Sequence, residues 1–76
     1  MSDLVDVTIH IDELLPSSNV EQIRDILLSQ SGVVAADCHE KTPHLLMVEY
    51  DPELADSGQL LASVVNQGVH AELIGL

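Results

Sequence analysis

The chain has 76 residues, and we expect one domain spanning residues 1–76. Apolar residues make up 46% of it, as in globular proteins, and Tyr50 is the only aromatic residue, so the core must be aliphatic. Thirteen acidic residues against two basic ones, Arg24 and Lys41, give a formal net charge of −11. Nucleic acids and anionic membranes are therefore excluded as expected partners, because both attract Lys and Arg. Cations and basic protein surfaces are favoured.

The cysteine content and the first residues of the chain further narrow the class of protein. Cys38 is the only cysteine, so neither an internal disulfide nor a Cys-x-x-Cys metal site can form. Residues 1–6 carry two acids and no base, unlike the positively charged start of a secretory signal. The apolar runs are too short to span a bilayer. We therefore expect a cytoplasmic protein.

The first half of the chain predicts a strand, a helix and a second strand. Residues 4–12 alternate apolar and polar, which predicts a half-buried strand. Its inward side chains are Val5, Val7, Ile9 and Ile11. Ser18 and Glu21 fit a capping box for a helix that ends at Gly32. Its apolar stripe is Val20, Ile23, Ile26 and Leu27. Residues 33–40 then predict a strand with Val34, Ala36 and Cys38 inward.

The second half repeats this order. A turn is expected at residues 41–43, followed by a strand over 44–50 with Leu46, Val48 and Tyr50 inward. Asp56 and Gln59 form a second cap-like pair, and Gly68 ends the helix that follows. That helix presents Leu60, Leu61, Val64 and Val65. Residues 69–76 predict a short final strand.

This order of elements leaves few topologies. Right-handed crossovers place both helices on one face of a four-stranded antiparallel sheet with strand order 4-1-3-2. We therefore expect an α+β protein, a ferredoxin-like βαββαβ sandwich whose second sheet face is open.

Three segments carry a family resemblance. They are Ser31–Ala36 (SGVVAA), Met47–Pro52 (MVEYDP) and Leu60–Val69 (LLASVVNQGV). With the first strand and helix in register, the chain resembles the heavy-metal-associated (HMA) domain over nearly its whole length. The resemblance implies a small binding protein that is not an enzyme and that has a role in metal binding and trafficking.

The family's metal-binding loop, Gly-Met-x-Cys-x-x-Cys, has no counterpart here. Residues 13–19 read ELLPSSN, and aligning Ile23 with the family's helix isoleucine puts Pro16 and Asn19 at the two cysteine positions. Neither side chain offers a thiolate, and Cu(I) requires soft sulfur ligands. The resemblance therefore implies the fold without the family's copper-relay chemistry.

Four histidines lie at one end of the predicted sheet. His10 and His70 fall on neighbouring strands with Asp12 and Glu72 close by on the same face. Imidazole and carboxylate suit borderline divalent ions, so we expect His10, His70 and one of the two carboxylates to bind Zn, Ni or Cu(II). A second, weaker pair is expected across the hairpin, formed by His39 and His44. The alternative is that all four histidines are merely exposed polar residues at strand ends.

The open sheet face also carries apolar residues. They are Leu45, Met47, Ile74 and Ala35. A contiguous exposed apolar patch is typical of a protein interface, so this face is expected to pair two copies or to bind another protein; scattered exposed apolar residues are the alternative. A metal-free interaction or regulatory module using this face is therefore the second candidate function. Two enzyme signatures are missing from the sequence. There is no glycine-rich phosphate loop, and Arg24, the only arginine, falls on a helix, so the first loop has no arginine to bind a phosphate group.

Overall fold

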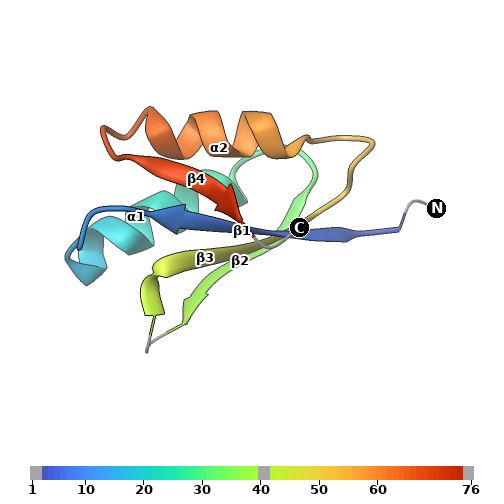
Figure 1. Cartoon of the computed structure of the whole chain (residues 1–76). Helices are drawn as coiled ribbons and strands as arrows, with labels where there is room; N and C mark the ends of the chain where they lie inside the picture. Colours follow the sequence, from blue (N-terminus) through green and yellow to red (C-terminus); the bar gives the residue numbers. More distant parts are fainter. Residues whose placement is uncertain (1–2, 40–41, 75–76) are drawn as a thin grey trace.

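The computed structural model describes residues 3–39 and 42–74. Its elements are β1 (Val5–Ile11), α1 (Ser17–Leu28), β2 (Val33–His39), β3 (Thr42–Tyr50), α2 (Ser57–Val65) and β4 (Ala71–Ile74), as Figure 1 shows. In the described part of the chain, neither helix is long and apolar enough to cross a membrane.

The four strands form one antiparallel sheet in the order β2-β3-β1-β4. This is the predicted order, and β1 lies in the middle because it pairs with both β3 and β4. Both helices lie on one side of the sheet (Figure 1). The predicted fold class is therefore confirmed, and the second sheet face is open.

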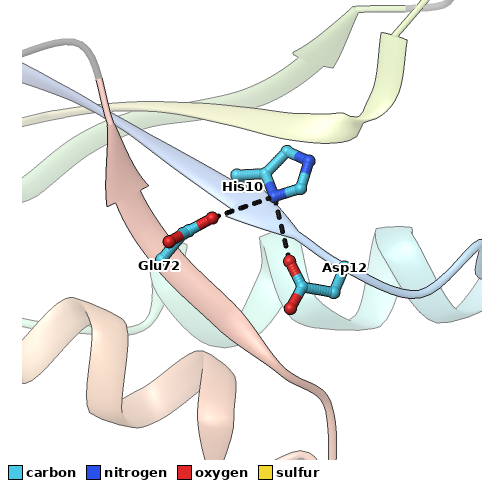
Figure 2. A group of neighbouring side chains, drawn as sticks. All are labelled: His10, Asp12 and Glu72. Atoms are coloured by element: carbon cyan, nitrogen blue, oxygen red, sulfur yellow. Dashed lines mark hydrogen bonds and ion pairs between the residues drawn. The ribbon is translucent and has the colours of Figure 1, made fainter.

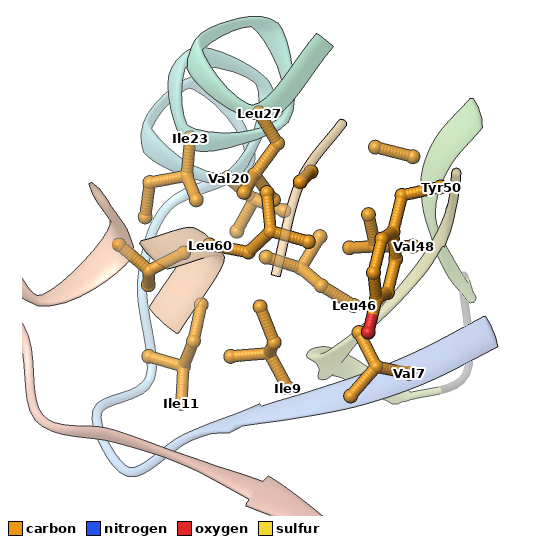
Figure 3. Packing of buried hydrophobic residues seen from close by; sticks show 13 residues of the cluster. Val7, Ile9, Ile11, Val20, Ile23, Leu27, Leu46, Val48, Tyr50 and Leu60 are labelled. Carbon is orange, nitrogen blue, oxygen red and sulfur yellow. The ribbon is translucent and has the colours of Figure 1, made fainter. Parts of the chain in front are cut away.

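The core lies between the helices and the sheet (Figure 3). The strands contribute Val7, Ile9, Ile11, Ala36, Leu46, Val48 and Tyr50, and the helices and the loop before α2 contribute Val20, Ile23, Leu27, Leu60, Val64 and Ala55. Because side chains alternate between the two faces of a strand, the core residues of β1 and β3 all point toward the helices. Each fully buried aliphatic side chain stabilises the fold by roughly 1.5–3 kcal/mol.

The predicted phase of β2 is wrong at its start. Val34 was expected to point inward, but it is 53% exposed, while Val33 packs against the core. The pairing with β3 shifts register between Val33 and Ala35, so one extra residue is accommodated there. After the shift the prediction holds, because Ala36 is buried and Cys38 is half-buried against the core.

The predicted capping box on α1 is also wrong. The helix begins at Ser17 with Pro16 as its N-cap, and no side chain caps it. The backbone N–H groups of Asn19 and Val20 donate to the Pro16 carbonyl at 3.0 and 3.2 Å. Proline's restricted φ, here −58°, suits this start and places Ser18 inside the first turn, beyond the capping position.

The remaining boundaries agree more closely with the prediction. Asp56 caps α2, because its Oδ1 accepts from the Gln59 N–H at 2.9 Å. Gly32 and Gly68 have the predicted positive φ angles, +90° and +89°. However, α1 ends at Leu28 and α2 at Val65, so each helix stops before its glycine. Val65, assigned to the apolar stripe of α2, is 42% exposed at the helix end.

Three predicted ends differ or fall outside the described residues. The strand β3 begins at Thr42, two residues early, so residues 42 and 43 of the predicted turn belong to the strand; residue 41 lies outside the described part of the chain. The strand β4 begins at Ala71 rather than at residue 69. Residues 40 and 75–76 of the predicted strands lie outside the described part of the chain.

Candidate metal centre

The site forms where β1 ends between its two neighbouring strands. Ile9 and Ile11 face the core, so His10 between them points to the open face. Across the sheet His10 pairs with Leu45 on β3 and Glu72 on β4. Asp12 lies two residues beyond His10, on the same side, and Figure 2 shows both carboxylates turned toward the His10 ring.

Three donor atoms converge in this group. The Nδ1 atom of His10 lies 3.1 Å from Asp12 Oδ1 and 3.7 Å from Glu72 Oε1. One ligand atom from each residue lies within 4.8 Å of the other two. Zinc bonds of 2.0–2.2 Å place tetrahedral ligand atoms about 3.3–3.6 Å apart, so small rotations would let the three atoms hold one ion. The His10 side chain is 31% exposed, and both carboxylates are more exposed.

The structure does not bring His70, the other predicted principal histidine, into this group. Residue 70 lies beside Asp12, whose N–H donates to the His70 carbonyl at 2.8 Å, while Glu72 occupies the position opposite His10. The His70 ring is held by Glu13, with Nδ1 2.7 Å from Oε2. The His70 backbone N–H also donates to Glu13 Oε1 at 2.9 Å.

Glu13 and His70 shift each other's acidity. The side-chain hydrogen bond to the Glu13 carboxylate, followed by its charge, raises the pKa of His70. The same bond and the one from the His70 backbone lower the pKa of Glu13. Sequence reasoning missed Glu13, because its partner lies 57 residues away and no local pattern marks the pair.

His44, expected to pair weakly with His39, contacts His10 in the structure. The His44 ring lies edge-on against the His10 ring, with centroids 5.3 Å apart and an interplanar angle of 83°. His44 therefore belongs to the His10 end of β1, because it precedes Leu45, the cross-strand partner of His10. The His39 backbone ends β2, and its side chain lies outside the described residues.

The positions matched to the family's cysteines serve the helix instead. Pro16 caps α1, and Asn19 lies in the first turn with its N–H bonded to the Pro16 carbonyl. Cys38, the sequence's only cysteine, is half-buried on β2 beside the core. No pair of thiolates can therefore form in this chain.

The open face has the apolar residues expected of it. Met47 is 57% exposed and Ile74 37% exposed, Ala35 is exposed, and Leu45 is half-buried. They lie on β2, β3 and β4, so no single element makes this surface. Their placement agrees with the alternation of the strands.

The fold is that of the heavy-metal-associated domains, as the sequence motifs predicted. A copper-binding domain from the P-type ATPase HMA7 has a TM-score of 0.83 at 16% identity, over 92% of this chain and 93% of that one. The N-terminal domain of a potential copper-translocating P-type ATPase from Bacillus subtilis, in the Cu(I)-loaded state, has a TM-score of 0.84 at 21% identity, over 93% and 88%.

A third similar structure is oxidized MerP from Ralstonia metallidurans CH34. It has a TM-score of 0.82 at 15% identity, over 93% of this chain and 97% of that one. No protein-family model matches the chain, and no curated protein matches it. At these identities the shared property is the fold.

Proposed function

We propose that this protein is a non-enzymatic metal-binding protein that holds a borderline divalent ion, Zn, Ni or Cu(II), through His10, Asp12 and Glu72. The observation that carries the proposal is the convergence of three donor atoms within 4.8 Å at one end of the sheet. Imidazole nitrogen and carboxylate oxygen together suit these ions.

The similar structures support metal binding, but the residues of this chain suit a different ion from theirs. Two of them are named for copper, and one is Cu(I)-loaded. Cu(I) requires soft sulfur, and this chain has one cysteine, half-buried on β2. The proposal therefore keeps the metal-binding role of the fold and replaces a thiolate-bound ion by one bound to nitrogen and oxygen.

His44 supplies a fourth ligand in this proposal. Two imidazoles bound to one tetrahedral zinc have ring centres about 5 Å apart, given zinc–nitrogen bonds of 2.0–2.1 Å. The observed separation between the His10 and His44 rings is 5.3 Å. Rotation of the His44 side chain would complete a set of two histidines and two carboxylates. The exposed carboxylates leave the ion accessible for exchange, as trafficking requires.

The test is titration of metal-free protein with Zn, Ni and Cu(II), followed by native mass spectrometry and calorimetry. The wild type should bind one ion, and His10→Ala should weaken binding by at least about a hundredfold, beyond the effect of losing an outer-shell partner. The matched control is His70→Ala, which removes a nearby histidine that Glu13 holds outside the cluster. It should bind like the wild type.

Two results would contradict the proposed site. One is equal affinity of the wild type and His10→Ala. The other is loss of binding in His70→Ala as large as in His10→Ala, which would mean that the ion is held by a different set of residues. An Asp12→Asn/Glu72→Gln variant separates the carboxylates from the ring and should also lose binding, with the fold checked by circular dichroism.

A further inference from the structure

The open sheet face has a hollow of about 260 Å³ between β1, β2 and β3, away from the histidine cluster. Its exposed lining comes from two rows of cross-strand neighbours. One row runs Ala35, Glu49 and Asp6; the other runs Asp37, Met47 and Thr8. Met47, an adaptable thioether side chain, lies in the middle of the second row with more than half of its surface exposed.

The hollow combines apolar side chains with like charges. Asp6 on β1 pairs directly with Glu49 on β3, and Asp37 lies one row further along on β2. Like charges directly opposite each other in a sheet destabilise it. The Asp37 Oδ1 atom accepts from the Cys38 N–H at 2.9 Å, which leaves its charge in place.

No basic side chain of the described residues compensates these charges. Arg24 lies on α1, on the far side of the sheet, where it pairs with Asp25 at 3.7 Å. Lys41 lies outside the described part of the chain. His10 lies on the same face, but its Nδ1 is directed at Asp12 and Glu72. The hollow is thus an acidic surface that the described chain leaves without a cation of its own.

We propose that this hollow binds a basic segment of another protein. The aliphatic stem of a Lys or Arg packs against Met47 and Ala35, and its charged group pairs with Asp6 and Glu49. Lys and Arg carry both parts in one side chain, an apolar stem and a cationic end. The net charge of −11 steers such a partner toward the protein.

Charge also selects this occupant over the others. A second copy of the chain would place Asp6, Asp37 and Glu49 against identical acids, and like-charge juxtaposition across an interface is unfavourable. Nucleic acid and anionic membranes are repelled for the same reason. The proposal does not depend on metal binding, because none of the hollow's residues belongs to the histidine cluster.

The experiment uses the whole chain in the presence of a chelator, with a labelled peptide of alternating lysine and alanine as the probe. Fluorescence anisotropy measures its affinity for the wild type and for Asp6→Asn/Glu49→Gln. That variant should bind roughly tenfold more weakly, as expected for the loss of two exposed ion pairs. It should also fold at least as stably as the wild type, since it removes a like-charge pair.

The matched control is Glu21→Gln/Asp25→Asn, which removes the same charge from α1 on the other side of the sheet. It should keep the wild-type affinity to within about twofold, because charges beyond a Debye length are screened. Amide chemical-shift changes should centre on Asp6, Ala35 and Met47. Equal weakening in the two variants, shifts centred elsewhere, or no binding by the wild type would each overturn the proposal.

Discussion

Gly32 lies between α1 and β2 with a φ of +90°, and it approaches the loop before α2 closely. A Cβ atom added there would lie 2.7 Å from the Cβ of Leu54 and 3.3 Å from that of Ala55. The Gly32 carbonyl also accepts from the Asp51 N–H at 2.8 Å. This glycine therefore serves two purposes, a left-handed turn and a close contact, and only the turn could be predicted from sequence.

Gly68 gives a matched comparison for that residue. Its φ is +89°, but a Cβ atom there would have no neighbour within 4 Å. Gly68→Ala should therefore cost only the left-handed strain, about 1–2 kcal/mol. Gly32→Ala should cost more, roughly 2–4 kcal/mol, because Leu54 must also move. Urea unfolding of the two variants measures the difference. Equal losses would show that the contact with Leu54 relaxes without cost.

At the scale of elements, the hydrogen-bonded pair Glu13–His70 connects two segments that are distant in sequence. Glu13, in the segment between β1 and α1, accepts from the backbone and ring of His70, which precedes β4. These hydrogen bonds involve the Glu13 side chain and lie outside the strand pairing. They hold the two segments together beside the proposed metal site. Their strength must depend on pH, because both partners titrate.

The sign of that dependence follows from the two shifts. The pKa of His70 is raised above 6.5, so its contribution to stability is complete below 6.5 and lost as pH rises through the raised value. The pKa of Glu13 is lowered from 4.5, so its contribution is complete above 4.5 and lost as pH falls through the lowered value. The pair is therefore most stabilising between these two ordinary values.

We expect the urea midpoint of metal-free wild type to exceed that of Glu13→Gln most between pH 4.5 and 6.5. The difference should shrink on both sides of this window. Glu21→Gln is the control, because Glu21 is exposed on α1 with no histidine partner among the described residues. A difference that stays constant across pH would show that the pair is not formed in solution.

The strand β2 shows where element-level prediction from sequence stops. Alternation alone put Val34 inward, and the register shift at residues 33–35 turned it outward. The shift depends on how β2 pairs with β3, which is a property of two strands and not of one. On β3, and on β1 from Val7 onward, the same alternation predicted the buried side chains correctly. Val5 was also expected to point inward, but it is 38% exposed at the start of β1.

At the scale of the whole molecule, charge is the dominant feature. Thirteen acids and two bases give −11 on a structure with a Cα radius of gyration of 11.4 Å. Repulsion among these acids opposes the compact state. Attractive charge contacts among the described residues include one Arg–carboxylate contact and the histidine pairs, against thirteen acids in the sequence.

Stability should therefore rise with salt. Raising NaCl from about 0.01 M to about 1 M shortens the Debye length from about 30 Å to about 3 Å and weakens the repulsion. We expect the free energy of unfolding to increase over this range, as measured by urea denaturation at pH 7. The increase should be smaller for Asp6→Asn/Glu49→Gln, which removes two directly opposed acids. A fall in stability with salt would mean that attractive pairs outweigh the repulsion.

The sequence by itself determined the fold class, the strand order, most of the core and the absence of a thiolate site. These depend on local periodicity, glycine stops and residue types, which act along the chain. The candidate site was determined in part. Sequence reasoning placed His10, Asp12 and Glu72 together, because β1 and β4 were predicted as neighbours and alternation assigned their faces.

Only the tertiary structure decided which histidines join that group. The register of β1 against β4 sets Glu72, and not His70, opposite His10. A two-residue shift, which leaves every side chain on its own face, would set His70 there instead. Glu13 holds His70 apart, and β3 brings His44 beside His10. Such contacts join residues far apart in the chain, so their geometry exists only once the strands have paired.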